Sequence, residues 1–369
     1  MFLQTILLIL ISLLSFLLPT QLGLHLNSLS TTVYGFKIDY LVPTIYLTDI
    51  IVFLVIALSI KKVHLKPKNI YIAILLVLFA AANVYISSYP VPALYKWIKV
   101  FEMLLLAIVI LNTKKFNVLN NFIIPLSLSV LLVSLLGIIQ FFLKGSLGGL
   151  FYFLGERNFT FSNPNVSPYP YATFSHPNSF AGFILVFEIL FIQYKKNIKN
   201  GYFWLVSLLV LTNLILTNSL NVYLTIAILI LFYLKRNLFL SFFSIDLGAR
   251  FITHRIELIN ASLKMIKQHF LLGVGLNNFI PTLVKVSNTF INSWELQPVH
   301  NIFLLVFSET GVIGLLLFCF VVFSSFQFTT SPLALIAILF TGLNDHYWLT
   351  LQQNILLFVF VLIIMRKNK

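Results

Sequence analysis

A histidine and a glutamate mark one long apolar run near the end of the chain. His300 stands at the mouth of this run and Glu309 lies inside it, in "QPVHNIFLLVFSETGVIGLLLF" (297–318). Imidazole changes its charge near neutral pH, so His300 could act as a general base, or it could make a structural hydrogen bond where a helix begins. An acid within an apolar run is costly unless it is paired or faces water, so Glu309 is a second candidate functional residue.

Three arginines lie apart from the basic clusters that recur along the chain. They are Arg157, Arg250 and Arg255. A guanidinium group keeps its charge and binds phosphate oxygens with a bidentate fork, which suits the diphosphate of a lipid headgroup. The alternative is that these arginines only anchor the chain at the lipid interface.

The sequence lacks the motifs of several other chemistries. It has no GxxxxGK[ST] loop, no HExxH motif, no Cys/His cluster with zinc spacing and no DxD pair to hold Mg²⁺. We therefore expect no metal and no cofactor. A sugar-diphosphate enzyme built from this chain would use arginines where others use a metal ion.

The composition is typical of a polytopic membrane protein. Of the 369 residues, 59% are hydrophobic and 9% are charged, and the mean hydropathy is +0.99. The net charge of +14 is spread over short basic clusters between apolar runs, which argues against a nucleic-acid partner. Because short Lys/Arg-rich loops mark the cytoplasmic side, we predict a multi-pass protein of the cytoplasmic membrane with both termini inside.

The apolar runs predict an all-α membrane helix bundle of about twelve transmembrane helices, with a range of ten to twelve. The runs lie near 2–20, 41–60, 69–87, 94–112, 119–142, 178–194, 202–217, 220–234, 238–247, 301–324, 332–344 and 349–365. Residues 1–369 form a single integral membrane domain in this interpretation.

Two predicted outer loops are too long to be simple connections. They cover residues 143–177 and 248–300. The second loop holds an amphipathic helix at 255–270, which we expect on or near the membrane surface. Its apolar residues recur at helical spacing, at Ile256, Ile259, Leu263, Ile266 and Phe270.

Three stretches of the chain resemble the motifs of a known family. "ATFSHPNSFAGFIL" (172–185) is similar to a GTF-x-x-PN-x-x-A-G stretch, and "RIELINASLKMIKQHFLLGVGLNNF" (255–279) to an Arg-led helix with a GVG turn. "VHNIFLLVFSETGVIGLL" (299–316) is similar to an HN-x-x-L…E-x-G-x-x-G stretch, and the tail "NDHYW" (344–348) is similar too. In this order and spacing, they resemble the O-antigen ligase and polymerase family of polytopic glycosyltransferases.

The resemblance implies transfer of a glycan from a polyprenyl diphosphate carrier, such as undecaprenyl diphosphate, at the outer face of the membrane. The acceptor would be a glycan, a lipid or a protein, and the transfer would invert the anomeric centre without a metal. The resemblance makes His300 the catalytic base and Arg255 a ligand of the donor diphosphate, with Arg157 and Arg250 beside it. The supporting candidates are Asn178, His176, Glu309, Asp345 and His346.

The chain departs from the family pattern at two positions where an arginine is usual. Tyr169 and Leu220 stand there instead. This leaves open a non-catalytic member of the family, and a transporter or flippase of lipid-linked glycans is the alternative from another class. Ligase and polymerase activities are not separated by the sequence, because they share a donor and differ in the acceptor.

Overall fold

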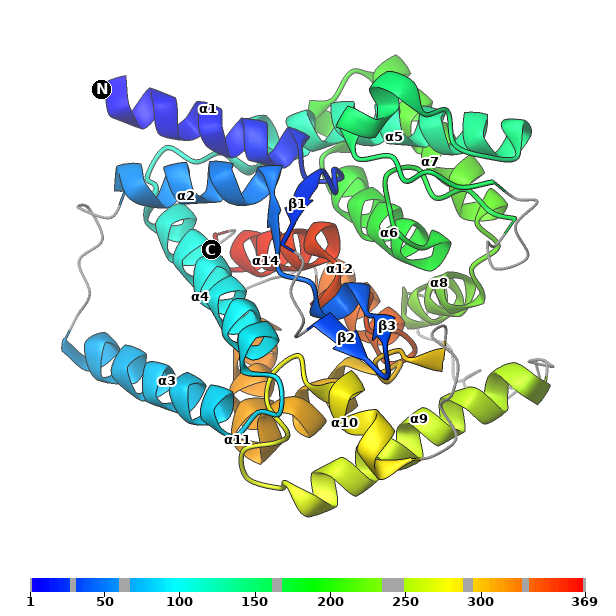
Figure 1. Cartoon of the computed structure of the whole chain (residues 1–369). Coiled ribbons are helices and arrows are strands. Elements are labelled where there is room, and N and C mark those ends of the chain that lie inside the picture. The colour runs from blue at the N-terminus through cyan, green and yellow to red at the C-terminus, as the bar shows by residue number, and fades with distance from the viewer. Residues whose placement is uncertain are drawn as a thin grey trace.

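The computed structural model describes most of the chain. The described residues are 2–26, 31–59, 67–160, 168–233, 249–287, 295–326 and 332–367. They form a mainly helical structure, as expected from the hydropathy pattern. Figure 1 shows α9 along one edge of the molecule, beside α10 and α11.

Eleven of the twelve predicted apolar runs coincide with helices, and the run at 238–247 lies outside the described residues. The helices of the first half are α1 (Phe2–Phe16), α2 (Leu47–Ser59), α3 (Pro67–Tyr85), α4 (Pro90–Asn112) and α5 (Ile124–Leu143). Those of the second half are α6 (Pro177–Gln193), α7 (Asn200–Leu216), α8 (Leu220–Tyr233), α9 (Ala249–Gln268), α10 (Phe279–Val286), α11 (Ile302–Ser325), α12 (Leu333–Gly342), α13 (Tyr347–Thr350) and α14 (Gln352–Lys367).

Two helical segments of the described chain are long and apolar enough to cross a membrane. They are Leu119–Leu143, which includes α5, and Ile302–Ser325, which is α11. Seven further apolar helices are shorter. The helical architecture is therefore confirmed in part, and the number of crossings stays a prediction.

The core is built around α6, which is buried along most of its length. Its phenylalanines fall at helical spacing, so they form a continuous packing surface. Helix α6 packs against α7, α8, α12 and α14. The largest fully buried side chains of the protein include Phe174, Phe180, Phe183, Phe187 and Phe191 from this region.

Short strands fill the segment between α1 and α2. Strand β1 (Gly23–His25) pairs antiparallel with β4 (Thr44–Tyr46), and β2 (Thr32–Val33) pairs with β3 (Phe36–Lys37). Tyr34 and Gly35 have positive φ, as the two central residues of a tight hairpin turn require. Figure 1 shows the β2–β3 hairpin near the centre of the molecule. The sequence pattern did not predict these strands.

Helix α9 is amphipathic, but the face that packs on the protein differs from the apolar stripe seen in the sequence. Leu258, Ala261 and Met265 are buried against the rest of the chain. Ile256 and Leu263, from the predicted stripe, are 50% and 52% exposed. Most of the stripe is thus exposed, but Ile266, which also belongs to it, is buried at 8% exposure. Contact of the exposed part with the membrane surface stays a prediction.

Candidate active site

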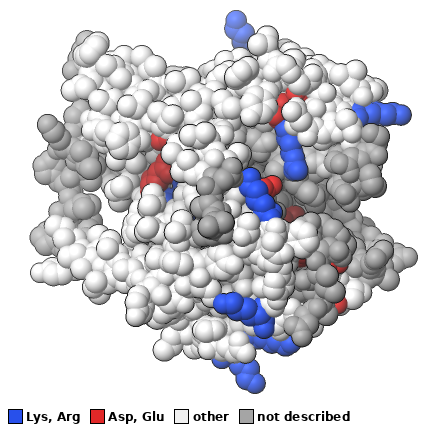
Figure 2. Space-filling view, viewed as in Figure 1, with Lys and Arg blue, Asp and Glu red and all other residues white. Residues whose placement is uncertain are grey.

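A large cavity collects most of the residues predicted to carry chemistry. Its volume is about 1130 Å³, and polar residues from distant parts of the chain line it. Among them are the predicted site residues Arg157, His176, Asn178, Arg255, His300, Asp345 and His346. Figure 2 shows a mainly uncharged face with small groups of acidic and basic side chains in its middle.

The residue that follows His300 holds it in place. Asn301 caps α11, because its side-chain oxygen accepts hydrogen bonds from the N–H groups of Phe303 and Leu304, both at 3.0 Å. Its side-chain nitrogen donates to the carbonyl of Leu343 at 3.1 Å. The HN pair therefore fixes the start of α11 and ties it to the turn that follows α12.

That turn brings an acid to the histidine. His300 Nδ1 lies 3.5 Å from Asp345 Oδ1, and the side chains are 16% and 8% exposed. A distance of 3.5 Å is long for a hydrogen bond, as is common in active sites that hold no substrate. With Nδ1 facing the carboxylate, the other ring nitrogen of His300, Nε2, is the one able to accept a proton.

Asp345 is held as an anion next to two imidazoles. Burial alone would raise the pKa of Asp345, but its interactions with His300 and with His346 hold that pKa well below the usual range. Burial lowers the pKa of His346 to about 3, so this ring is neutral at neutral pH. The rings of His300 and His346 have their centroids 5.0 Å apart.

Hydrogen bonds fix the orientation of His346 and Asp345. Asp345 Oδ1 accepts from the backbone N–H of His346 at 2.8 Å, and His346 Nδ1 lies 2.9 Å from Thr350 Oγ1. Tyr40 meets the edge of the His346 ring at a centroid distance of 5.5 Å. Burial and the charge of Asp345 raise the pKa of Tyr40, so its hydroxyl stays protonated in the cavity.

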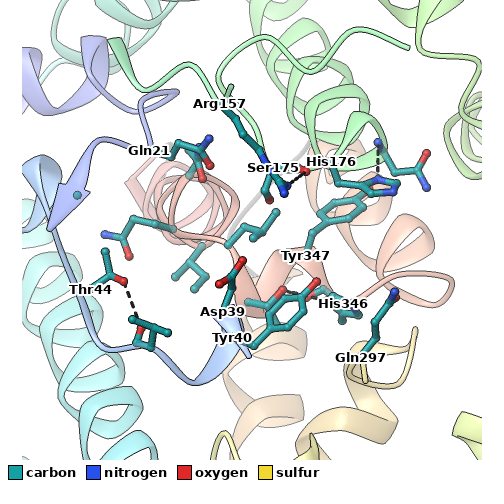
Figure 3. A pocket seen from close by; sticks show the side chains of 18 of the residues that line it. Gln21, Asp39, Tyr40, Thr44, Arg157, Ser175, His176, Gln297, His346 and Tyr347 are labelled. Atoms are coloured by element: carbon teal, nitrogen blue, oxygen red, sulfur yellow. Dashed lines mark hydrogen bonds between the residues drawn. The ribbon is translucent and has the colours of Figure 1, made fainter. Parts of the chain in front are cut away.

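A buried carboxylate positions the loop that carries Arg157. Glu156 accepts hydrogen bonds from the N–H groups of Leu147 and Gly148 at 2.8 Å, and from the side chain of Gln140 at 2.7 Å. Arg157 is exposed to the cavity and donates to the carbonyl of Ser175 at 3.3 Å. Figure 3 shows this bond on the same side of the cavity as His176 and Tyr347.

His176 and Asn178 form the N-terminus of α6. His176 is the N-cap residue, and its Nδ1 accepts from the backbone N–H of Asn178 at 3.1 Å. Pro177 occupies the first helical position, where its missing N–H costs nothing. Both predicted side chains line the cavity, and the PN motif starts the buried core helix at this point.

Arg255 reaches the cavity from α9. Burial lowers the pKa of Arg255, opposed by the charge of Asp345, yet a guanidinium group keeps its charge at neutral pH. The cavity therefore has arginines from two separate segments, Arg157 and Arg255, on its lining. The side chain of Arg250 lies outside the described residues.

Glu309 does not line this cavity. It forms hydrogen bonds that hold the neighbouring backbone in place. Its carboxylate accepts from the N–H of Phe279, the first residue of α10, at 3.2 Å. Its backbone carbonyl accepts from the N–H of Gly275 at 3.0 Å and from the side chain of Asn83 at 2.9 Å. The glutamate predicted as a supporting residue thus holds the GVG turn and α10.

A break in α11 makes this arrangement possible. Gly311 has φ +66° and ψ −170°, which interrupts the helix. The carbonyl groups of Ser308 and Glu309, freed by the break, accept from Val274 and Gly275 of the GVG turn. A Cβ at Gly311 would lie 2.2 Å from the carbonyl oxygen of Leu271, so only glycine fits there.

The two positions where the family pattern has arginine, Tyr169 and Leu220, lie away from the cavity lining. The side chain of Asn218, two residues before Leu220, donates to the Tyr169 hydroxyl at 3.3 Å. Neither Tyr169 nor Leu220 lines the cavity. The charges that the pattern would place there are replaced by a neutral contact.

Three of the described residues could hold a metal ion. His300, Asp345 and His346 each offer a ligand atom, and these atoms lie within 4.8 Å of one another. Two of them are already engaged, because His346 contacts Thr350 and Asp345 accepts from a backbone N–H. Metal-independent transfer stays a prediction.

Residues 170–319 match the family model described as O-antigen ligase. The resemblance predicted from the three motifs is thereby confirmed. The matched part contains His176, Arg255, His300 and Glu309, whereas Arg157 and Asp345 lie outside it. No curated protein and no solved structure matches the chain.

Proposed function

We propose that this chain, through its O-antigen ligase domain, transfers a glycan from a polyprenyl diphosphate carrier to an acceptor hydroxyl. The family match supports glycosyl transfer in polysaccharide biosynthesis at a general level, and the family is embedded in membranes. The observation that carries the finer proposal is the His300–Asp345 pair in one cavity with Arg157 and Arg255.

The chemistry is a single displacement at the anomeric carbon. His300 Nε2 removes the proton of the acceptor hydroxyl as its oxygen bonds to the anomeric carbon. The bond from that carbon to the diphosphate oxygen breaks at the same time, and the carrier leaves as polyprenyl diphosphate. Attack from the face opposite the leaving group inverts the anomeric configuration.

The charged residues have separate roles in this step. Asp345 holds the imidazole through Nδ1 and stabilises the imidazolium that forms, which is the role of an acid behind a catalytic histidine. Arg157 and Arg255 bind the diphosphate and stabilise the negative charge that develops on it. We place this reaction at the outer face of the cytoplasmic membrane, where the carrier-linked donor and the acceptor meet.

The proposal is tested with purified protein in lipid vesicles that contain a polyprenyl diphosphate oligosaccharide and a hydroxyl acceptor. We expect polyprenyl diphosphate to be released and a glycosidic bond of inverted configuration to form, in the presence of a chelator such as EDTA. NMR of the product reports the anomeric configuration. Movement of the intact donor across the vesicle membrane, with no bond cleaved, would instead identify a flippase.

A further inference from the structure

The cavity has a second wall, which the proposed reaction does not yet use. It is formed by β4, the start of α4 and the start of α14, and we call it the α4 wall. Its residues are Thr44, Tyr46, Tyr95, Lys96, Lys99 and Gln352. Figure 3 shows Thr44 across the cavity from His176, His346 and Gln297.

The α4 wall is held together by polar contacts. The Tyr95 hydroxyl donates to the carbonyl of Thr44 at 2.8 Å, which joins α4 to β4. Asp49 accepts from the backbone N–H of Tyr46 and from the side chain of Gln352, both at 2.7 Å. These contacts connect three elements, so the α4 wall is a built surface.

One lysine of this wall is already neutralised. Lys99 forms ion pairs with Asp49 and with Glu102, the second at 3.2 Å. Its ammonium group also lies over the rings of Tyr46 and Tyr95, at 5.5 and 5.8 Å from their centroids. Two carboxylates on one cation leave no net positive charge to bind an anion.

Lys96, the other lysine of the α4 wall, differs from Lys99 in its partners. Lys96 lines the cavity, but within the described part of the chain it forms neither an ion pair nor a side-chain hydrogen bond. The acid that acts on it electrostatically is Glu309, whose carboxylate already accepts from Phe279. A cation inside a helix bundle is energetically costly unless a partner or water compensates its charge. An anion that enters the cavity would supply this compensation, so Lys96 can bind one.

The residues around Lys96 indicate which kind of molecule bears the anionic group. Tyrosine rings can pack against the C–H face of a sugar. The amide nitrogen of Gln352 is bound to Asp49, but its amide oxygen can accept from a sugar hydroxyl. The cavity volume of about 1130 Å³ also exceeds the roughly 300–1000 Å³ usual for one small ligand. There is room for an acceptor sugar beside the donor.

We propose that the α4 wall binds the acceptor and that the acceptor is an acidic saccharide, with its carboxylate or phosphate on Lys96. This inference rests on the proposed function, because Arg157 and Arg255 are assigned to the donor diphosphate and leave this wall to the acceptor. The acidic group on Lys96 then orients the sugar, so that one hydroxyl faces His300 across the cavity.

The experiment compares the binding of three soluble sugars to the full-length protein in nanodiscs. Glucuronic acid carries a carboxylate, glucose 6-phosphate carries a phosphate, and glucose is the neutral reference. We expect at least one acidic sugar to bind about tenfold more tightly than glucose, since close pairs of opposite charges at a binding interface are worth at least this much. Which of the two binds more tightly distinguishes a carboxylate from a phosphate acceptor.

Variants test whether Lys96 is the cause. Lys96→Gln should remove the preference for the acidic sugar, and Lys96→Arg should retain it. Lys37→Gln is the matched control, because Lys37 lines the same cavity but is exposed. Equal binding of all three sugars by the wild-type protein, or a preference that survives in Lys96→Gln, would overturn the inference.

Equal binding of the three sugars by the wild-type protein overturns the inference even where Lys96→Gln does not fold. Binding is measured without any turnover, so this result is separate from the test of the proposed function. If His300 is essential for turnover but the protein does not prefer acidic sugars, only the proposed acceptor site is refuted. An acidic preference that depends on Lys96, in a protein that transfers no glycan, would refute only the transfer.

Discussion

His300 Nδ1 and Asp345 Oδ1 lie 3.5 Å apart although 45 positions separate the two residues in the sequence. The contact depends on Asn301, which caps α11 and bonds to Leu343 in the turn before Asp345. Asp345, the acid that contacts His300, therefore comes from the C-terminal part of the chain, beyond the matched O-antigen ligase domain (170–319).

Asp345→Asn should lower the rate of transfer by a factor on the order of 10² to 10⁴. The amide keeps the shape of the carboxylate but cannot stabilise an imidazolium, so donor binding should persist while turnover is lost. Asp39→Asn is the control, because Asp39 is an exposed acid on the same cavity lining. Near-normal turnover in Asp345→Asn would show that the contact is only structural.

His300→Gln should be nearly as inactive as His300→Ala, because glutamine can form a hydrogen bond but cannot accept the proton. Donor affinity, which we assign to the arginines, should be retained in both variants. Measuring donor binding and turnover separately checks this. A glutamine variant with a large share of the activity would make orientation the role of His300, and the base would then be sought at His176, His346 or Asp345.

Arg255→Lys should reduce turnover by a factor on the order of 10² to 10³, because lysine keeps the charge but loses the bidentate fork. Lys267→Ala on the same helix is the control, since Lys267 is exposed. Kinetics at saturating donor separate an effect on the transition state from an effect on binding. Unchanged kinetics in Arg255→Lys would reduce Arg255 to an interfacial anchor.

Acid should destabilise the protein over a defined pH range. His346 has a pKa of about 3 when folded and about 6.5 when unfolded, so between these values the unfolded state binds the additional proton. The free energy of unfolding should therefore fall by about 1.4 kcal/mol per pH unit as the pH is lowered through this range. Asp345 acts in the same direction at lower pH, because its pKa is also depressed in the folded state.

Thermal unfolding in detergent at several pH values measures this effect. His346→Asn should flatten the dependence, whereas His269→Asn should leave it unchanged because His269 is exposed. A slope that is the same in His346→Asn and in the wild type would mean that the titrating group lies elsewhere.

The loops that carry the site should face outward. In a background where Cys319 is replaced by serine, a cysteine at Ser287 should react with a membrane-impermeant thiol reagent in intact cells. A cysteine at Asn197, in the exposed turn between α6 and α7, should not react until the membrane is opened. The reverse pattern would invert the topology and place the site inside.

Hydropathy and motif spacing predicted much of this molecule, because both report local properties. The apolar runs marked the helices, and the three motifs placed His300, Arg255 and His176 at one site. The pairing of His300 with Asp345 was not predictable, because it depends on how two turns meet. Glu309 was predicted only as a supporting residue, since its role follows from a backbone break at Gly311 that composition does not reveal.

Lys96 illustrates another limit of the sequence. It stands in an apolar helix close to Lys99, and the pattern alone treats the two residues alike. Only the folded chain shows that Lys99 forms ion pairs with two acids and that Lys96 forms none within the described residues. The proposed role of the α4 wall therefore could not be derived from residue types.

The contact between Ser262 and Ser308, whose hydroxyl oxygens lie 2.9 Å apart, fixes the rotational phase of α9 against α11. Arg255 lies seven residues before Ser262, which is about two helical turns, so both residues fall on the same side of α9. One residue inserted between them would rotate the guanidinium by about 100° around the helix axis. The seven-residue interval between Arg255 and Ser262 therefore sets the direction in which the Arg255 side chain leaves α9, and a change in its length would turn the guanidinium group away from the cavity.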